Sequence, residues 1–499
     1  MREIAVVGAG MGAMAAAARL AVAGRRVVVF ERSETYGGSL GVVERDGFRF
    51  DTGPGVLPLP AVYRDLFVKT GRAALEERVV LEQREPAVRH VFADGAVVDL
   101  PNASRAGVGA ALDGALGRDA GARWAQFMDR AREAWNRSRR PLLEETLWPN
   151  WQVLAEREPY PARAPRRLLR RGTPPTTLAG VAQAELGGDA RLRALLEHYA
   201  LVHGLDPRSA PAAAAVLPYL EQTFGVWSVA GGLRALATAL YERCRERRVV
   251  FRFGSEVTGV REKDGAAAGV VTADGAVHEA DAVVAGVFPA ALDALSPAPV
   301  RGPGEVGGMA SAPSRLTVLL ALRGAAAAGA PVRTVVHTPD RGGELEAVFG
   351  AEARGVPAAP TVVVRRTSDP LLVPDGGHEA VTVTATVPAG AEVTAADVER
   401  LVERAGAAVE GLRERLLWHE ARTPADIAAA TGAPGGAVPP PALPAAGGRL
   451  LHPANSTRLP GLYAVGGWSH PGGGLPHAGM SGALAAGLIV EGPGFQGSR

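Results

Sequence analysis

Residues 2–31 read REIAVVGAGMGAMAAAARLAVAGRRVVVFE, and they decide the fold of this chain. The apolar run 2–7 predicts a short buried strand, the alanine-rich run to about Gly24 predicts a helix, and 27–30 predict a second strand. The glycine turn 8–13 lies between the first strand and the helix. This order of strand, glycine turn, helix and strand predicts a βαβ unit that binds a dinucleotide.

Each part of the unit has a physical task. Gly8 permits the tight turn, Gly10 lets the backbone approach a pyrophosphate, and Ala13 is small enough for close helix–strand packing. The helix N-terminus offers free N–H groups and a partial positive charge to the pyrophosphate. Glu31 lies 23 positions after Gly8, where a carboxylate can accept hydrogen bonds from ribose hydroxyls. The alternative is a glycine-rich turn before an ordinary packed helix, but both strands and the terminal acid favour the dinucleotide.

The bulk composition excludes several classes of protein. The 499 residues suffice for two or three domains, and a net charge of +2 favours neither nucleic acid nor an acidic ligand. Cys244 is the only cysteine, so no intrachain disulfide is expected. No apolar run reaches the length of a membrane-spanning helix, and the chain enters its first strand without room for a signal peptide. These features predict a cytoplasmic protein.

Strand–turn–helix patterns recur at 225–290 and 460–490. In the first of these, a glycine turn at 225–233 is expected to open a helix that runs to about Arg247. The recurrence predicts one discontinuous Rossmann-type nucleotide domain, assembled from residues 1–78, 216–298 and 446–499. The intervening residues 79–215 and 299–445 are expected to form a mixed α+β substrate domain.

Further motifs give the chain a family resemblance. Besides the opening stretch they are YGGSL, GFRFDTGPGVLPLPAVYRDLF, HYALVHGLDPRSAPAAAAVLPYLEQTFGVW, VAGGLRALATAL and GLYAVGGWSHPGGGLPHAGMSGALAAGLI. In this order, and over nearly the whole length, the chain resembles the phytoene desaturase family of flavoproteins, the bacterial carotenoid-desaturase type within the amine-oxidase-like group. The resemblance implies a two-domain α/β flavoprotein with FAD as its cofactor.

The resemblance also implies which residues hold FAD. Glu31 would bind the adenosine ribose, the backbone of Val257 would contact the adenine, and a helix beginning at about His477 would place positive potential by the pyrimidine side of the ring. The full implied cofactor site consists of Gly8, Gly10, Met11, Gly12, Ala13, Glu31, Arg32, Gly37, Gly38, Ser39, Gly53, Pro54, Val257, Gly466, Gly467, Gly474, Leu475 and Pro476.

Three departures from the family pattern concern the surroundings of the flavin and the substrate, and the first of them removes a cation near the flavin. Ser39 stands where the family often has Arg or Lys, and Ser228 stands where a bulky aromatic residue or His is common, which predicts a wider cavity. The family's usual Tyr-Val-Gly segment reads Leu-Val-His-Gly at 201–204. The altered segment indicates a substrate other than an ordinary C40 carotene, and the three differences together support a reductive cyclase as the alternative.

The implied activity is hydride transfer between FAD and an apolar polyene or isoprenoid, in a desaturation or a related redox step. The sequence has no nucleophile elbow and no metal-spacing cluster, so no metal site is expected. His470, His477 and His203 are the candidate acid–base residues, with structural roles as the alternative. Asp51 is expected to orient its loop by hydrogen bonds, and Trp227 is a candidate for packing near the flavin, against ordinary core packing.

Two other functions remain open. One is a flavin- and NAD(P)H-dependent reductive cyclase acting on a polyene polyketide, in which NAD(P)H would bind transiently because only one full dinucleotide motif is present. The other is a non-catalytic flavin or prenyl carrier. The stretch 148–171 mixes Arg, Trp and Tyr, which suits either a peripheral membrane contact or a solvated connector. Substrate identity and oligomeric state are not predicted.

Overall fold

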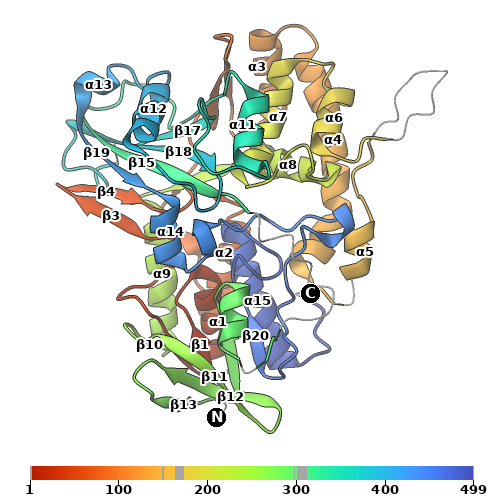
Figure 1. Cartoon of the computed structure of the whole chain (residues 1–499), viewed down its shortest axis with the longest axis vertical. Coiled ribbons are helices and arrows are strands. Elements are labelled where there is room, and N and C mark those ends of the chain that lie inside the picture. Colours follow the sequence, from red (N-terminus) through yellow and green to blue (C-terminus); the bar gives the residue numbers. More distant parts are fainter. Residues whose placement is uncertain are drawn as a thin grey trace.

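The computed structural model describes residues 3–148, 151–162, 174–296, 298–300, 312–367 and 369–497. Its lower half in Figure 1 is built on a five-stranded sheet of order β10-β2-β1-β14-β20, in which all neighbouring strands are parallel. The strands are β1 (Glu3–Val7), β2 (Arg26–Phe30), β10 (Val250–Arg252), β14 (Ala282–Ala285) and β20 (Leu462–Ala464). The helix α1 (Met11–Val22) joins β1 to β2, which confirms the predicted βαβ unit.

Small residues let distant segments pack closely against α1. The helices α9 (Leu233–Glu246) and α15 (Leu475–Glu491) both pack against α1. A Cβ added at Gly12 would lie only 2.8 Å from the Cα of Gly466, so this contact requires glycine. An antiparallel sheet of β11 (Val257–Lys263), β12 (Ala266–Thr272) and β13 (Val277–Glu279) borders this half and contains the predicted hairpin at 274–275.

The second large sheet lies at the upper left of Figure 1 and has the order β19-β15-β18-β17-β16-β7-β8. Its strands are β7 (Val88–Val91), β8 (Val97–Leu100), β15 (Ser314–Arg323), β16 (Arg333–Val336), β17 (Val362–Thr367), β18 (His378–Val387) and β19 (Leu416–Arg422). One face is apolar and packs against α12 (Ala395–Ala405). Because side chains alternate along a strand, the other face carries Arg315, Thr317, Thr384 and Thr386, together with the row Arg333, Arg365 and Thr382.

A group of helices stands beside this sheet, at the upper right of Figure 1. It contains α3 (Arg105–Leu116), α4 (Ala120–Arg139), α6 (Leu178–Glu185), α7 (Ala190–Val202) and α8 (Val216–Phe224), which share a core around Trp124, Phe127 and Tyr199. The predicted helical stretch 105–140 is thus two helices, separated where Asp119 takes a left-handed conformation with φ 70°. The remaining elements are β3 (Val42–Arg45), β4 (Phe48–Asp51), α2 (Ala61–Gly71), α10 (Pro289–Ala294), α11 (Arg341–Phe349), α13 (Leu412–Arg415) and α14 (Pro424–Thr431).

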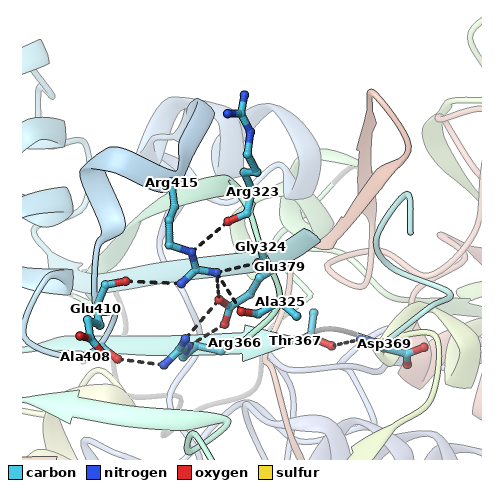
Figure 2. A network of polar contacts seen from close by, with 10 residues as sticks. All are labelled: Arg323, Gly324, Ala325, Arg366, Thr367, Asp369, Glu379, Ala408, Glu410 and Arg415. Carbon is cyan, nitrogen blue, oxygen red and sulfur yellow. Dashed lines mark hydrogen bonds and ion pairs between the residues drawn. The ribbon is translucent and has the colours of Figure 1, made fainter. Parts of the chain in front are cut away.

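A buried ion-pair network lies at one end of the central strands of the seven-stranded sheet (Figure 2). The Glu379 side chain is fully buried and accepts Arg366 Nε at 2.6 Å and Arg415 Nη2 at 2.7 Å. The guanidinium of Arg415 also donates to the carbonyls of Arg323 and Gly324. Because two cations share one buried carboxylate, the network ties β17, β18 and α13 together.

Two predictions about individual segments need comment. The glycine turn expected at 225–233 begins instead as a strand, β9 (Val226–Val229), which pairs with β5 (Leu57–Pro58) and β6 (Leu81–Glu82). Valine and tryptophan favour a pleated conformation, and the turn is confined to 231–232. Of the stretch 148–171, only Trp148, α5 (Trp151–Glu156) and residues up to 162 are described, so most of its arginines lie outside the described residues. No helix in the described ranges is long and apolar enough to cross a membrane.

Candidate functional site

Three helices of the nucleotide-binding half begin near one another, and two of them have uncapped N-termini. In the described part of the chain, no side chain caps α1 at Gly10 or α15 at Gly474, and neither first turn contains an acid. The third helix, α9, is capped because Asp51 accepts the backbone N–H groups of Leu233 at 2.6 Å and Arg234 at 3.1 Å. Uncapped N–H groups can donate hydrogen bonds to the oxygens of a ligand, as the predicted binding of FAD requires.

Glycines from three distant segments form an open cradle at these helix ends. A Cβ added at Gly10 or at Gly466 would meet no atom within 4 Å, while one at Gly38 would lie 3.1 Å from the Cα of Gly10. The N–H of Gly37 donates to the carbonyl of Ala9 at 2.8 Å and so holds the second glycine pair against the first turn. The space above these backbones fits a diphosphate and ribityl chain, which need close approach to main-chain atoms.

The carboxylate of Glu31 is fixed at the carboxyl end of β2. Its Oε2 accepts the N–H of Ala9 at 2.7 Å, and its Oε1 accepts the N–H and hydroxyl of Ser33, both at 2.9 Å. Further lone pairs on the carboxylate suit ribose hydroxyls. The neighbouring Arg32 side chain lies elsewhere, because its guanidinium donates to the carbonyls of residues 429 and 430 at the end of α14.

The other predicted cofactor residues fall into two groups. Met11, Gly12 and Ala13 are buried in the first turns of α1, and Val257 is buried among Val28 and Phe30 at the end of β2. Ser39, Gly53 and Pro54 lie around a second loop, where a Cβ at Gly53 would lie 2.7 Å from the carbonyl oxygen of Ser39. A Cβ at Gly467 would lie 2.8 Å from the Pro439 ring, whereas Leu475 and Pro476 form the buried first turn of α15. Their contacts with FAD remain predictions.

The three candidate histidines lie within electrostatic range of one position at the start of α15. Burial, together with the smaller effects of His203, His452 and His470, lowers the pKa of His477 to about 3. Nδ1 of His203 bonds to the carbonyl of Tyr199 at 2.7 Å, and Nε2 of His470 to the carbonyl of Glu145 at 3.0 Å. Burial also lowers the pKa of His203, and that of His470 to about 4. All three imidazoles are therefore neutral at pH 7, and burial makes each of them a weaker base than free histidine, so their acid–base roles stay predictions.

A cavity of about 490 Å³ lies between the polar face of the seven-stranded sheet and the loop that follows β4. Asp51, Gly55 and Val56 contribute from the loop, on both sides of the predicted flavin contacts at 53–54. Ser228 lines it from β9, as expected for the residue thought to widen a cavity. Arg365 and Thr382 line it from the sheet, although no motif in the sequence marks them as site residues. The alternation of apolar and polar side chains along 362–367 predicts a strand. It does not show which face of that strand borders the site, because the neighbouring strands are not known from the sequence.

Two further expectations concern residues near the site. The hydrogen bonds from α9 confirm that Asp51 orients its loop. Trp227 packs under the guanidinium of Arg64, whose Cζ lies 5.2 Å from the ring centroid, and against the core of the nucleotide-binding half, as an ordinary core residue would. Among the described residues, no group of three or more His, Cys, Asp or Glu side chains is arranged to hold a metal ion.

Comparisons with known proteins identify the family. Residues 14–490 match the protein family described as "Flavin containing amine oxidoreductase". The chain is 30% identical to a hydroxyneurosporene desaturase from Cereibacter sphaeroides, with 98% of this chain and 97% of that protein covered. It is 28% identical to a 4,4'-diapolycopene oxygenase from Methylomonas sp, with 98% of both chains covered. Among solved structures, an oxidoreductase from Methanosarcina mazei shares the fold, with a TM-score of 0.61, 18% identity, and coverage of 96% of this chain and 99% of that one.

Proposed function

The chain belongs to the flavin containing amine oxidoreductase family, in the branch of the phytoene desaturases, and is a flavin-dependent oxidoreductase; we propose that it binds FAD and desaturates a polyene or isoprenoid substrate. One observation carries the proposal. Two uncapped helix N-termini border an open glycine cradle, and the loop at Gly53 lies against Ser39 next to that cradle. Asp51 and Gly55 of the same loop line the cavity. A cofactor in the cradle and a substrate in the cavity would thus be neighbours.

When bound, the flavin supplies the acceptor or donor of a hydride. The chain's own residues hold and orient the reactants. Gly8, Gly10 and the start of α1 would bind the diphosphate, Glu31 the ribose, and the start of α15 the pyrimidine side of the ring. Asp51 holds the loop between cradle and cavity by its two bonds to α9. The imidazole of His477 is our candidate for accepting the proton that a substrate carbon would lose, and this role stays a prediction.

The experiment that tests the proposal is product analysis by mass spectrometry. The flavin-loaded protein is incubated with neutral polyenes such as phytoene and neurosporene, with and without NADPH. Desaturation predicts products lighter by two hydrogens per new double bond, formed without NADPH when an electron acceptor is present. Unchanged substrate under every condition, from protein with full flavin content, would refute the proposal.

A second candidate is a reductive cyclase that uses NAD(P)H and acts on a more oxygenated polyene. It is favoured by one observation, the serine, threonine and arginine side chains along the cavity wall. Reductive cyclisation predicts that NADPH bleaches the flavin and that products form only when NADPH is supplied. If neither a polyene nor NADPH reduces the flavin in the absence of oxygen, the result would favour a non-catalytic carrier instead.

A further inference from the structure

Arg365 crosses the cavity from the sheet to the loop beside the proposed flavin site. It pairs with Arg333 on β16 and with Thr382 on β18, so these three side chains lie on the same face of the sheet, and all three line the cavity. A Cβ at Gly55 would overlap the Arg365 guanidinium. The guanidinium therefore reaches the loop only because residue 55 is glycine.

Arg365 is left without a partner, unlike the other charged residues along the lining. Within the described ranges, its side chain forms no hydrogen bond and no ion pair. The acids are engaged, since Asp51 caps α9 and Asp369 accepts the N–H groups of residues 231 and 371. The remaining charges form ion pairs, namely Arg333 with Glu221, Arg84 with Glu82, Arg49 with Glu44, and Arg366 with Glu379.

An unpaired guanidinium away from bulk water is unfavourable unless something compensates its charge. Burial lowers the pKa of Arg365, yet a guanidinium stays protonated at neutral pH. Its planar fork matches a carboxylate with two parallel hydrogen bonds. Thr382 adds a hydroxyl from the neighbouring strand position.

We propose that the substrate carries a carboxylate, or an equally acidic oxygen group, which Arg365 binds inside this cavity. This inference rests on the proposed function and narrows it, because a substrate so anchored would be a polyene acid rather than a hydrocarbon. The carboxylate of Asp51 faces the same guanidinium, and the two charges stabilise each other without a hydrogen bond or ion pair between them. Asp51 instead accepts its hydrogen bonds from the N-terminus of α9. The substrate carboxylate would thus accept hydrogen bonds from the guanidinium N–H groups of Arg365, none of which is bonded to Asp51.

The test compares two probes of the same shape on the flavin-loaded full chain, all-trans-retinoic acid and all-trans-retinol. Isothermal titration calorimetry gives their dissociation constants. The wild type is expected to bind the acid about 10- to 100-fold more tightly than the alcohol, as for a hydrogen bond between charged groups. Arg365→Gln should abolish this preference. The matched control Arg323→Gln, an exposed arginine on β15 of the same sheet, should keep it.

A second variant protects the test against misfolding of the first. Gly55→Ala leaves the charge in place but displaces the guanidinium from the loop, so it too should reduce the preference. Arg365→Lys should restore part of it, because an ammonium keeps the charge without the fork. Equal binding of both probes by the wild type, no binding of the acid, or a preference that survives Arg365→Gln would overturn the proposal. The proposal would also be overturned if NADPH competed with retinoic acid for binding in the wild type but not in Arg365→Gln.

The same samples separate this inference from the proposed function. Desaturation of a neutral polyene without any preference for the acid would contradict only the anion site. An acid preference in a protein whose flavin never exchanges electrons with a polyene would contradict only the proposed function.

Discussion

Asp51 accepts the backbone N–H of Leu233 at 2.6 Å, a bond between the end of β4 and the start of a helix 182 residues later in the chain. The same carboxylate accepts the N–H of Arg234. Its loop continues into the proposed flavin contacts and the cavity wall, so one side chain couples two distant segments at the site.

Replacing Asp51 with Ala should therefore lower both stability and flavin retention. Loss of a helix cap costs about 1–2 kcal/mol in the free energy of unfolding. Urea unfolding with flavin quantified in the same samples measures both effects. The control is Asp340→Ala, which removes a comparable cap from α11 through the bond to Gly343 but lies outside the site. If both variants lose flavin equally, the positioning role of Asp51 is wrong.

The glycine cradle predicts opposite outcomes for two Gly→Ala substitutions. Neither Gly10 nor Gly109 has an atom within 4 Å of the added methyl group. Gly109→Ala in α3 should raise stability by about 0.5–1 kcal/mol, because alanine favours helix. Gly10→Ala should leave the apoprotein folded but weaken flavin binding at least about tenfold, since the methyl group enters the space assigned to the diphosphate. Normal flavin affinity in Gly10→Ala would place the diphosphate elsewhere.

The network in Figure 2 predicts a large loss of stability. Glu379→Gln leaves Arg366 and Arg415 around a neutral side chain in a fully buried position. Removing one partner of a buried ion pair costs about 3–5 kcal/mol. Glu399→Gln removes an exposed partner of Arg413 and should cost less than about 1 kcal/mol. Chemical denaturation of both variants checks the difference, and equal losses would show that the buried network contributes no more than a surface pair.

His470 makes stability depend on pH. Its pKa of about 4 lies below the ordinary value of 6.5, so the unfolded chain binds more protons between these values. The stabilisation is present above pH 6.5 and is lost as pH falls toward 4, by about 3 kcal/mol in total. His470→Gln should flatten this dependence in unfolding experiments at several pH values, whereas His419→Gln, on an exposed residue of β19, should not. An unchanged slope in His470→Gln would assign the acid sensitivity to other groups.

Local chemistry explains why some of this structure could be predicted from the sequence. Gly8 to Glu31 form a unit of consecutive residues whose turn, helix and strands specify one another, and α1, β1 and β2 appear at the expected places. The helix predicted near His477 begins at Leu475, because Pro476 suits a first turn.

The cavity wall could not be predicted in the same way. Arg365 lies in the cavity wall because β17 pairs with β18 and β16. No local feature of the sequence predicts that these strands pair. Ser228 could be predicted to border a cavity, but the opposite cavity wall on the sheet could not. Alternation along a strand does not show which of its faces is turned toward the site. The requirement for glycine at residue 55 could not be predicted either, because it comes from the side chain of Arg365, 310 positions later in the chain.

The most direct measurement of the central claim is the visible absorption of the bound flavin after mixing with a polyene in the absence of oxygen. A flavin-dependent desaturase predicts that the oxidised flavin bleaches with the polyene alone and recovers when an acceptor is added, while one double bond forms per flavin reduced. A flavin that stays oxidised with every polyene tested, and that does not reoxidise with a polyene after chemical reduction, would contradict the claim.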